Sequence, residues 1–239
     1  MIHWLTAFLD LPAGSVEADL AFWQAVTEST LSSRRGERSQ FVTLVPREGD
    51  AYLRGQTVLD GTGGTHLDLH VDDPDETADR ALSLGARQRH RRPGFAVLAS
   101  PAGIGLCLVR HHGEVDRPAP VRRMDGARSV VDQLCLDIPP DVYERECAFW
   151  SALTGWSLSG SQHTEFQHLR GPEGMPLGLL LQRLDHGPAG AHLDLACDDA
   201  DEEAVIHAAL GASIAYRGKG WITLRDPAGL AYCVTRRNP

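Results

Sequence analysis

The feature that most constrains this chain is an internal duplication. Residues 64–73 read Gly-Thr-His-Leu-Asp-Leu-His-Val-Asp-Asp, and residues 190–199, which lie 126 positions later, read Gly-Ala-His-Leu-Asp-Leu-Ala-Cys-Asp-Asp. Shorter matches follow in the same order at offsets of 126 or 127: Ala-Phe-Trp at 21–23 and 148–150, Leu-Gly-Ala at 84–86 and 210–212, and Pro-Ala-Gly at 101–103 and 227–229. Ordered matches at nearly constant spacing predict two homologous modules.

The modules are predicted to span residues 1–112 and 129–239. Residues 113–128 form the predicted linker, because prolines and charges there break both helical and strand periodicity. In the first module, hydrophobic periodicity predicts strands at 2–10, 41–45, 51–53, 64–71, 95–99 and 104–110. It also predicts a helix at 15–27 with Ser15 as N-cap, and a second helix that begins at Pro74 and has its C-cap at Gly85. Each module therefore contains the order β-α-β-β-β twice, and the predicted fold class is α+β.

The amino-acid composition limits which classes of binding partner the chain can have. The formal net charge of −9 gives no general attraction to nucleic acid phosphates, and the arginines are scattered along the chain. The N-terminal segment lacks the basic residues of a signal peptide, and no apolar run approaches membrane-spanning length. The five cysteines include no C-x-x-C pair, which favours a reduced, cytoplasmic protein. We expect neither nucleic acid nor a membrane as a partner.

The duplicated segment carries the strongest candidate for chemistry. Apolar and polar residues alternate in it, so one face of the predicted strand presents His66, Asp68 and His70. Three titratable groups on one face of a strand are costly to bury unless they are used. One interpretation is therefore a catalytic row in which His66 acts as a general base, Asp68 tunes it, and His70 lies beside it. The alternative is a structural role, in which the His66 ring donates an N–H group to a nearby carbonyl or carboxylate. At the matching position of His192 a structural role is favoured.

These motifs resemble the vicinal oxygen chelate superfamily, which includes glyoxalases, bleomycin-resistance proteins and extradiol dioxygenases. The matching features are a first strand ending at Asp10, a first helix with Ala-Phe-Trp, a central strand opening with His, a Leu-Gly-Ala helix end, and a final Asp-Pro-Ala-Gly hairpin. The resemblance covers nearly the whole chain twice. It implies two tandem glyoxalase-like modules, each made of two βαβββ units that form a cupped mixed sheet with helices outside.

In catalytic members of the superfamily a divalent metal lies in the cup. The resemblance implies that its ligands in the first module are His3, His66 and Cys107, where Cys107 replaces the usual glutamate. Such a set could hold zinc, iron or nickel. An alternative interpretation of Cys107 is simple core packing, because it lies in an apolar strand and is repeated in the second module as Cys233. In that module the first ligand position is occupied by Val130.

Two functions remain open from the sequence. The first is binding of a small organic molecule in the cup of the first module without an obligatory metal, for sequestration or biosynthesis. The second is a metal-dependent lyase, isomerase or dioxygenase that uses His3, His66 and Cys107. In either case Phe95, Trp221 and Trp23 are the candidate ligand-binding aromatics. The chain is expected to be a monomer or a homodimer.

Overall fold

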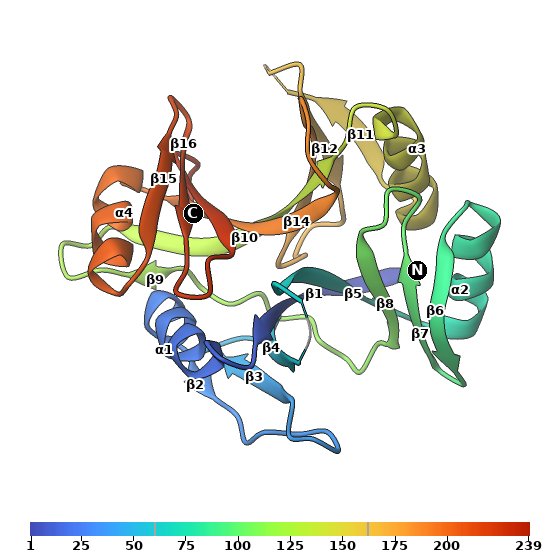
Figure 1. Cartoon of the computed structure of the whole chain (residues 1–239), viewed down its shortest axis with the longest axis horizontal. Helices are drawn as coiled ribbons and strands as arrows, with labels where there is room; N and C mark the ends of the chain where they lie inside the picture. The colour runs from blue at the N-terminus through green and yellow to red at the C-terminus, as the bar shows by residue number, and fades with distance from the viewer. Residues whose placement is uncertain (60, 162) are drawn as a thin grey trace. The chain divides into compact units, whose positions relative to one another are not determined.

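The computed structural model describes residues 1–59, 61–161 and 163–239 (Figure 1). The elements are, in chain order, β1 (Ile2–Pro12), α1 (Val16–Thr27), β2 (Thr30–Leu31), β3 (Phe41–Val45), β4 (Leu53–Val58), β5 (Gly64–Val71), α2 (Pro74–Ser83), β6 (Arg87–Arg92), β7 (Phe95–Ala99), β8 (Gly105–Arg110), β9 (Val121–Arg122), β10 (Arg128–Ile138), α3 (Tyr143–Thr154), β11 (Ser157–Gly160), β12 (Phe166–Arg170), β13 (Gly178–Arg183), β14 (Gly190–Cys197), α4 (Ala200–Ala209), β15 (Ser213–Arg217), β16 (Trp221–Arg225) and β17 (Ala231–Thr235). This order confirms the β-α-β-β-β pattern in both repeats.

The strands form two mixed sheets, one for each repeat. The first has the order β2-β3-β4-β1-β5-β8-β7-β6, and the second has the order β11-β12-β13-β10-β14-β17-β16-β15, with β9 paired to β10. In the first sheet β5 pairs parallel with β8, and in the second β14 pairs parallel with β17, whereas β8 and β17 pair antiparallel with their hairpin partners. The predicted α+β class with two tandem modules is confirmed.

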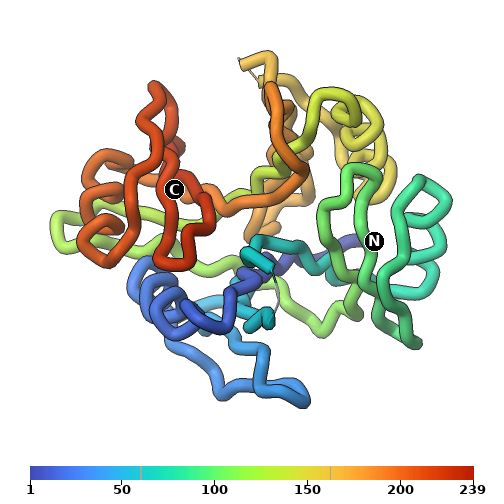
Figure 2. The backbone as a smooth tube through the Cα atoms, in the orientation of Figure 1, coloured from blue at the N-terminus to red at the C-terminus, as the bar shows by residue number. Residues whose placement is uncertain are grey.

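The close contacts within the chain group it into two compact units that differ from the sequence repeats. Unit 1 comprises Met1–Ala7, Thr65–Asp116 and Leu134–Ala191, and unit 2 comprises Phe8–Gly64, Arg117–Gln133 and His192–Pro239. Each unit therefore takes one βαβββ half from each repeat. In unit 1 the helices α2 and α3, which come from different repeats, lie side by side (Figure 2).

The core of unit 1 explains why the duplicated segment is a strand. Leu67, Leu69 and Val71 on one face of β5 are 0% exposed. Full burial of such aliphatic side chains contributes about 1.5–3 kcal/mol each. The helix that follows β5 begins where the Asp73 carboxylate accepts hydrogen bonds from the backbone N–H groups of Asp75 and Glu76. That helix, α2, contacts β7 and β8.

The repeated Ala-Phe-Trp and Pro-Ala-Gly motifs meet within each unit. In unit 1, the Glu146 carboxylate of α3 accepts hydrogen bonds from Trp150 Nε1 at 2.8 Å and from the Ala102 N–H at 2.8 Å. Unit 2 has a related arrangement, in which Asp19 of α1 accepts a hydrogen bond from the Ala228 N–H at 2.7 Å. A buried carboxylate on each first helix thus binds the closing hairpin turn of the other repeat, which accounts for both motifs.

Several local predictions need adjustment. The strand predicted at 51–53 is β4, which begins at Leu53 and continues to Val58. Ser15 precedes α1, but its hydroxyl donates to the Pro12 carbonyl instead of accepting from the helix. Strand β6 was not predicted, because it is exposed on nearly all its residues and carries no apolar alternation.

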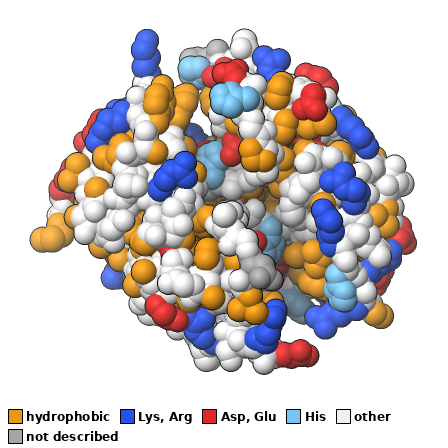
Figure 3. Space-filling model, viewed as in Figure 1, with side chains coloured by type: hydrophobic (Ala, Val, Ile, Leu, Met, Phe, Trp, Pro, Cys, Tyr) orange, Lys and Arg blue, Asp and Glu red, His pale blue; other side chains and the backbone are white. Residues whose placement is uncertain are grey.

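No helix in the part of the chain that the structure describes is long and apolar enough to cross a membrane. On the face shown in Figure 3, the side chains of Lys and Arg are interspersed with those of Asp and Glu.

Candidate functional site

The polar face of β5 lies in a buried environment. The side chains of His66 and Asp68 are 16% and 6% exposed, and that of His70 is 2% exposed. Alternation along the strand directs all three to the face opposite the aliphatic core residues. His66 is the member of the row that is most accessible from solvent.

The sheet register adds two side chains to this face. In the parallel pair of β5 and β8, Cys107 lies beside Asp68 and Val109 lies beside His70. In the neighbouring pair of β7 and β8, Phe95 lies beside Val109. Laterally paired residues point to the same side of a sheet. Cys107 and the predicted ligand-binding residue Phe95 therefore share the face of the polar row.

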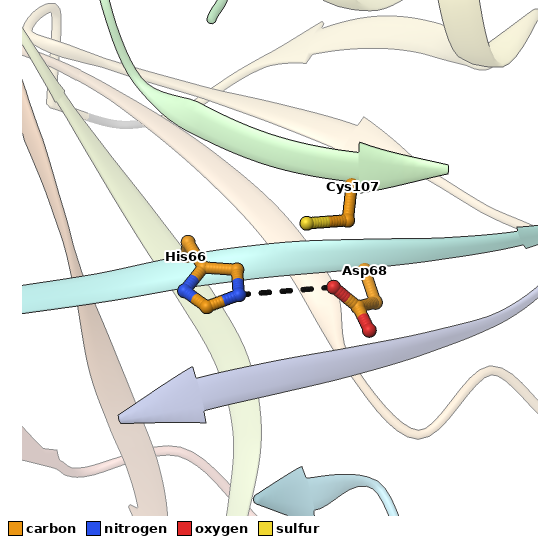
Figure 4. Close-up of side chains that lie close together, drawn as sticks. All are labelled: His66, Asp68 and Cys107. Carbon is orange, nitrogen blue, oxygen red and sulfur yellow. Dashed lines mark ion pairs between the residues drawn. The ribbon is translucent and has the colours of Figure 1, made fainter. Parts of the chain in front are cut away.

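His66, Asp68 and Cys107 form a cluster that we call the first cluster (Figure 4). One donor atom from each residue lies within 4.8 Å of the others. His66 Nε2 is 3.8 Å from Asp68 Oδ1. Two members come from β5 and the third from β8, so the parallel pairing of these strands creates the cluster.

The second repeat contains the corresponding group, the second cluster, formed by His192, Asp194 and Cys233. His192 Nε2 is 3.4 Å from Asp194 Oδ1 and 3.8 Å from Cys233 Sγ. Asp194 Oδ2 accepts a hydrogen bond of 2.7 Å from Gln133 Nε2 and lies 3.8 Å from Arg237 Nη1. A guanidinium beside this carboxylate opposes the binding of a cation.

His3, the third metal ligand implied by the resemblance, is not brought to the first cluster. Its Nε2 lies 2.7 Å from Asp72 Oδ1, at the end of β5. His66 is six residues earlier on the same strand, which corresponds to a separation of about 20 Å at 3.3 Å per residue. The structure therefore brings His66 and Cys107 together with Asp68, and leaves His3 in a different environment.

The aromatic candidates also differ in their surroundings. Trp23 is 1% exposed, and its Nε1 donates to Asp226 Oδ2 at 3.0 Å, so it is an interior residue that holds a turn. Trp221 is half-buried on β16, beside Thr235 of β17. Phe95 is half-buried, with the Arg92 guanidinium 5.1 Å from its ring centre. Phe95 and Trp221 can offer a ring face to a ligand, whereas Trp23 is enclosed.

His70 belongs to a different group from His66. Its Nε2 is 2.9 Å from Thr6 Oγ1, and its Nδ1 is 3.5 Å from Glu114 Oε1. The carboxylate of Glu114 also lies 3.2 Å from His111 Nδ1. This group could not be predicted from the sequence, because His111 follows the last strand of the first module and Glu114 lies in the predicted linker. The parallel direction of β5 and β8 brings their ends together, and that pairing is the signal that would have identified it.

Comparison with known proteins identifies the family to which the chain belongs. A family model described as glyoxalase-like domain matches residues 6–109 and 133–235. The chain therefore belongs to the glyoxalase-like domain family and contains two tandem copies of the domain. Among curated proteins, none matches this chain.

Solved structures with the same fold include several enzymes. The chain aligns over 98% of its length with 92% of the 2,3-dioxygenase LapB from Pseudomonas sp. KL28, at 12% identity and a TM-score of 0.65. It aligns over 98% of its length with 81% of a Mn(II)-bound glyoxalase from Novosphingobium aromaticivorans, at 16% identity and a TM-score of 0.62. A 4-hydroxymandelate synthase variant from Streptomyces coelicolor aligns over all of this chain and 93% of its own, at 16% identity and a TM-score of 0.61. The TM-scores of 0.61–0.65 show a common fold at these low identities.

The first cluster is chemically suited to a metal ion. It combines an imidazole nitrogen, a carboxylate oxygen and a thiol sulfur, a set that matches the ligand types of Zn²⁺ and Fe²⁺. A thiol suits these ions better than Mn²⁺, which prefers oxygen ligands. Asp68 and Cys107 are 4% and 7% exposed, so their negative charge in the ionised state would be poorly solvated and would favour a cation. The residues present therefore fit a divalent ion.

Proposed function

We propose that the chain is a metal-dependent enzyme of the glyoxalase-like class, in which His66, Asp68 and Cys107 hold a divalent ion. The observation that carries this proposal is the convergence of their donor atoms within 4.8 Å on adjacent parallel strands. The substrate class is a small organic molecule with adjacent oxygen atoms, and the reaction is that of a lyase, isomerase or dioxygenase. Relatives by fold that include dioxygenases and a Mn(II)-bound glyoxalase support this class.

Each residue has a distinct part in this proposal. Asp68 and Cys107 supply negative charge from the buried side of the cluster, and His66 supplies a neutral nitrogen at its more accessible edge. A divalent ion bound there would polarise substrate oxygen atoms as a Lewis acid. Phe95, on the same face, offers an apolar surface against which an organic substrate can be oriented.

Metal analysis tests the proposal directly. Protein purified without chelator, and then supplied with Zn²⁺ or Fe²⁺, is expected to retain one tightly bound equivalent at the first cluster. His66→Ala should lose that equivalent, whereas the matched variant His192→Ala should retain it, because Arg237 already neutralises the second cluster. The proposal would be refuted if the wild-type protein bound none of these ions, or if both variants lost the same amount of bound metal. Ring cleavage of catechol by the Fe²⁺-loaded protein is the first activity to assay, since a catechol dioxygenase shares the fold.

Metal-free binding of a small organic molecule is the second candidate function. The arrangement of Phe95 on the face of the polar row supports it, because an aromatic wall and a His66–Asp68 pair could together bind a polar ligand. In this case His66 accepts a proton from the ligand and Asp68 stabilises the resulting imidazolium. Ligand binding that is unchanged after chelation and abolished in His66→Ala would favour this candidate. The cytoplasmic location and the monomeric or homodimeric state remain predictions of the sequence.

A further inference from the structure

A second group of potential ligands lies at the end of β5, in unit 1. His70, His111 and Glu114 form this group, which we call the edge cluster, and one donor atom from each lies within 4.8 Å of the others. His70 ends the polar row of β5, His111 follows β8, and Glu114 lies in the segment after it. His66 is four residues before His70 on the same strand, so the two clusters are about 13 Å apart along β5.

Two separations in the edge cluster, each to a different oxygen of the Glu114 carboxylate, are close to those between ligands around a metal. His70 Nδ1 is 3.5 Å from Glu114 Oε1, and His111 Nδ1 is 3.2 Å from Glu114 Oε2. In a tetrahedral zinc site with bonds of about 2.0–2.1 Å, neighbouring ligand atoms are about 3.3 Å apart. Two imidazole nitrogens and one carboxylate oxygen are also a ligand set used by zinc sites that keep an open position.

Neighbouring residues orient both imidazoles. His70 Nε2 is hydrogen-bonded to Thr6 Oγ1 at 2.9 Å, which leaves Nδ1 on the side of Glu114. The ring of His111 stacks on that of His3, with 4.7 Å between ring centres. The side chain of His3 is in turn hydrogen-bonded to Asp72. Contacts of this kind fix ring orientation around metal ions and strengthen binding.

Charge and access are also favourable. The Glu114 carboxylate is held beside the two imidazoles, because its Oε2 accepts a hydrogen bond of 3.0 Å from the backbone N–H of His112. The side chains of His111 and Glu114 are 19% and 18% exposed, whereas that of His70 is 2% exposed. An ion can therefore approach from the side of His111 and Glu114, with His70 as the innermost ligand.

We infer that His70, His111 and Glu114 form a second divalent metal site, with zinc as the ion that best fits the ligand set. This site is independent of the first cluster, because it shares none of its residues. Three protein ligands leave one position of a tetrahedral ion for water or a substrate group. The inference can therefore be tested independently of the proposed enzyme function.

Zinc stoichiometry in a background without the first cluster tests the inference. The full chain with His66→Ala is dialysed against Zn²⁺, and bound zinc is measured by atomic absorption. Adding Glu114→Gln or His111→Ala should remove one equivalent, whereas His112→Ala, an exposed neighbour, should not. Thr6→Val should weaken zinc binding by roughly 10–100-fold, because it removes the partner that orients His70.

A folding control completes the experiment. Added Zn²⁺ should raise the thermal unfolding temperature of the His66→Ala protein, and Glu114→Gln should abolish the increase while its circular dichroism stays unchanged. Equal zinc content with and without Glu114→Gln would overturn the inference and leave the edge cluster as an imidazole–carboxylate network. Loss of zinc on His66→Ala alone concerns only the first cluster, so failure of one proposal is distinguishable from failure of the other.

Discussion

Replacement of Asp226 by asparagine tests how the closing hairpin of the second repeat is held. The two carboxylate oxygens of Asp226 accept separate hydrogen bonds, from Trp23 Nε1 at 3.0 Å and from the Leu230 N–H at 2.8 Å. Burial raises the pKa of this carboxyl to about 6, with the hydrogen bond from Trp23 opposing and the charge of Asp19 reinforcing the shift. Between pH 3.8 and about 6, the folded protein therefore retains a proton that the unfolded chain has lost.

The shift of about two pH units corresponds to about 3 kcal/mol at 1.36 kcal/mol per unit. Because the pKa of Asp226 is raised on folding, this group stabilises the folded state least at high pH. The free energy of unfolding should fall as the pH rises from 3.8 to about 6, and then level off. Between pH 4.5 and 7.5 the expected loss from this group alone is about 2 kcal/mol.

The assay is urea unfolding at pH 4.5 and 7.5, followed by tryptophan fluorescence. Asp226→Asn loses a hydrogen-bond acceptor at every pH, at a cost of about 1–3 kcal/mol, because its amide nitrogen cannot accept. Its loss of stability between the two pH values should nevertheless be about 2 kcal/mol smaller than that of the wild type. Asp185→Asn, an exposed control, should follow the wild type. Parallel pH dependence of Asp226→Asn and the wild type would refute the reasoning.

Two other substitutions give distinct outcomes. Burial raises the pKa of Glu203, but hydrogen bonds from His207 and Arg123 outweigh this effect and lower the pKa to about 2. The free energy of unfolding should therefore fall by about 3 kcal/mol as the pH falls from 4.5 toward 2. Acid unfolding monitored by circular dichroism should be less steep in Glu203→Gln, and an unchanged profile would contradict this assignment. Gly63→Ala places a Cβ 2.4 Å from a backbone carbonyl oxygen at φ +78°, and should lower the free energy of unfolding by about 1–3 kcal/mol. Gly61→Ala, also at positive φ but in open space, should cost less in the same urea titration, and equal losses would show that the close contact is unimportant.

The architecture could be predicted from the sequence because its signals are local and repeated. The alternation of His66, Asp68 and His70 with aliphatic residues indicated a strand, and the structure has β5 at Gly64–Val71. Pro74 indicated the start of a helix, and α2 begins there. The matches between repeats then predicted the order of the remaining elements.

Strand pairing could not be predicted in the same way. Parallel pairing of β5 with β8 is a long-range contact, and it decides that Cys107 lies beside Asp68 and that His111 lies near His70. The position of His3 shows the same limit, since the resemblance implied a ligand beside His66, but the side chain of His3 is hydrogen-bonded to Asp72. Side-chain type suggested which groups could bind a metal, whereas register determined which groups meet.

The most direct test of the proposed function is the absorption spectrum of the Co²⁺-substituted protein. Cobalt bound at the first cluster contacts the sulfur of Cys107 and should show a thiolate-to-cobalt charge-transfer band in the near ultraviolet. The edge cluster has only nitrogen and oxygen donors, so it does not contribute to this band. We predict that Cys107→Ser abolishes the band and that the matched variant Cys233→Ser retains it. A band that persists in Cys107→Ser, or its absence from the wild type at saturating Co²⁺, would contradict a metal centre formed by His66, Asp68 and Cys107.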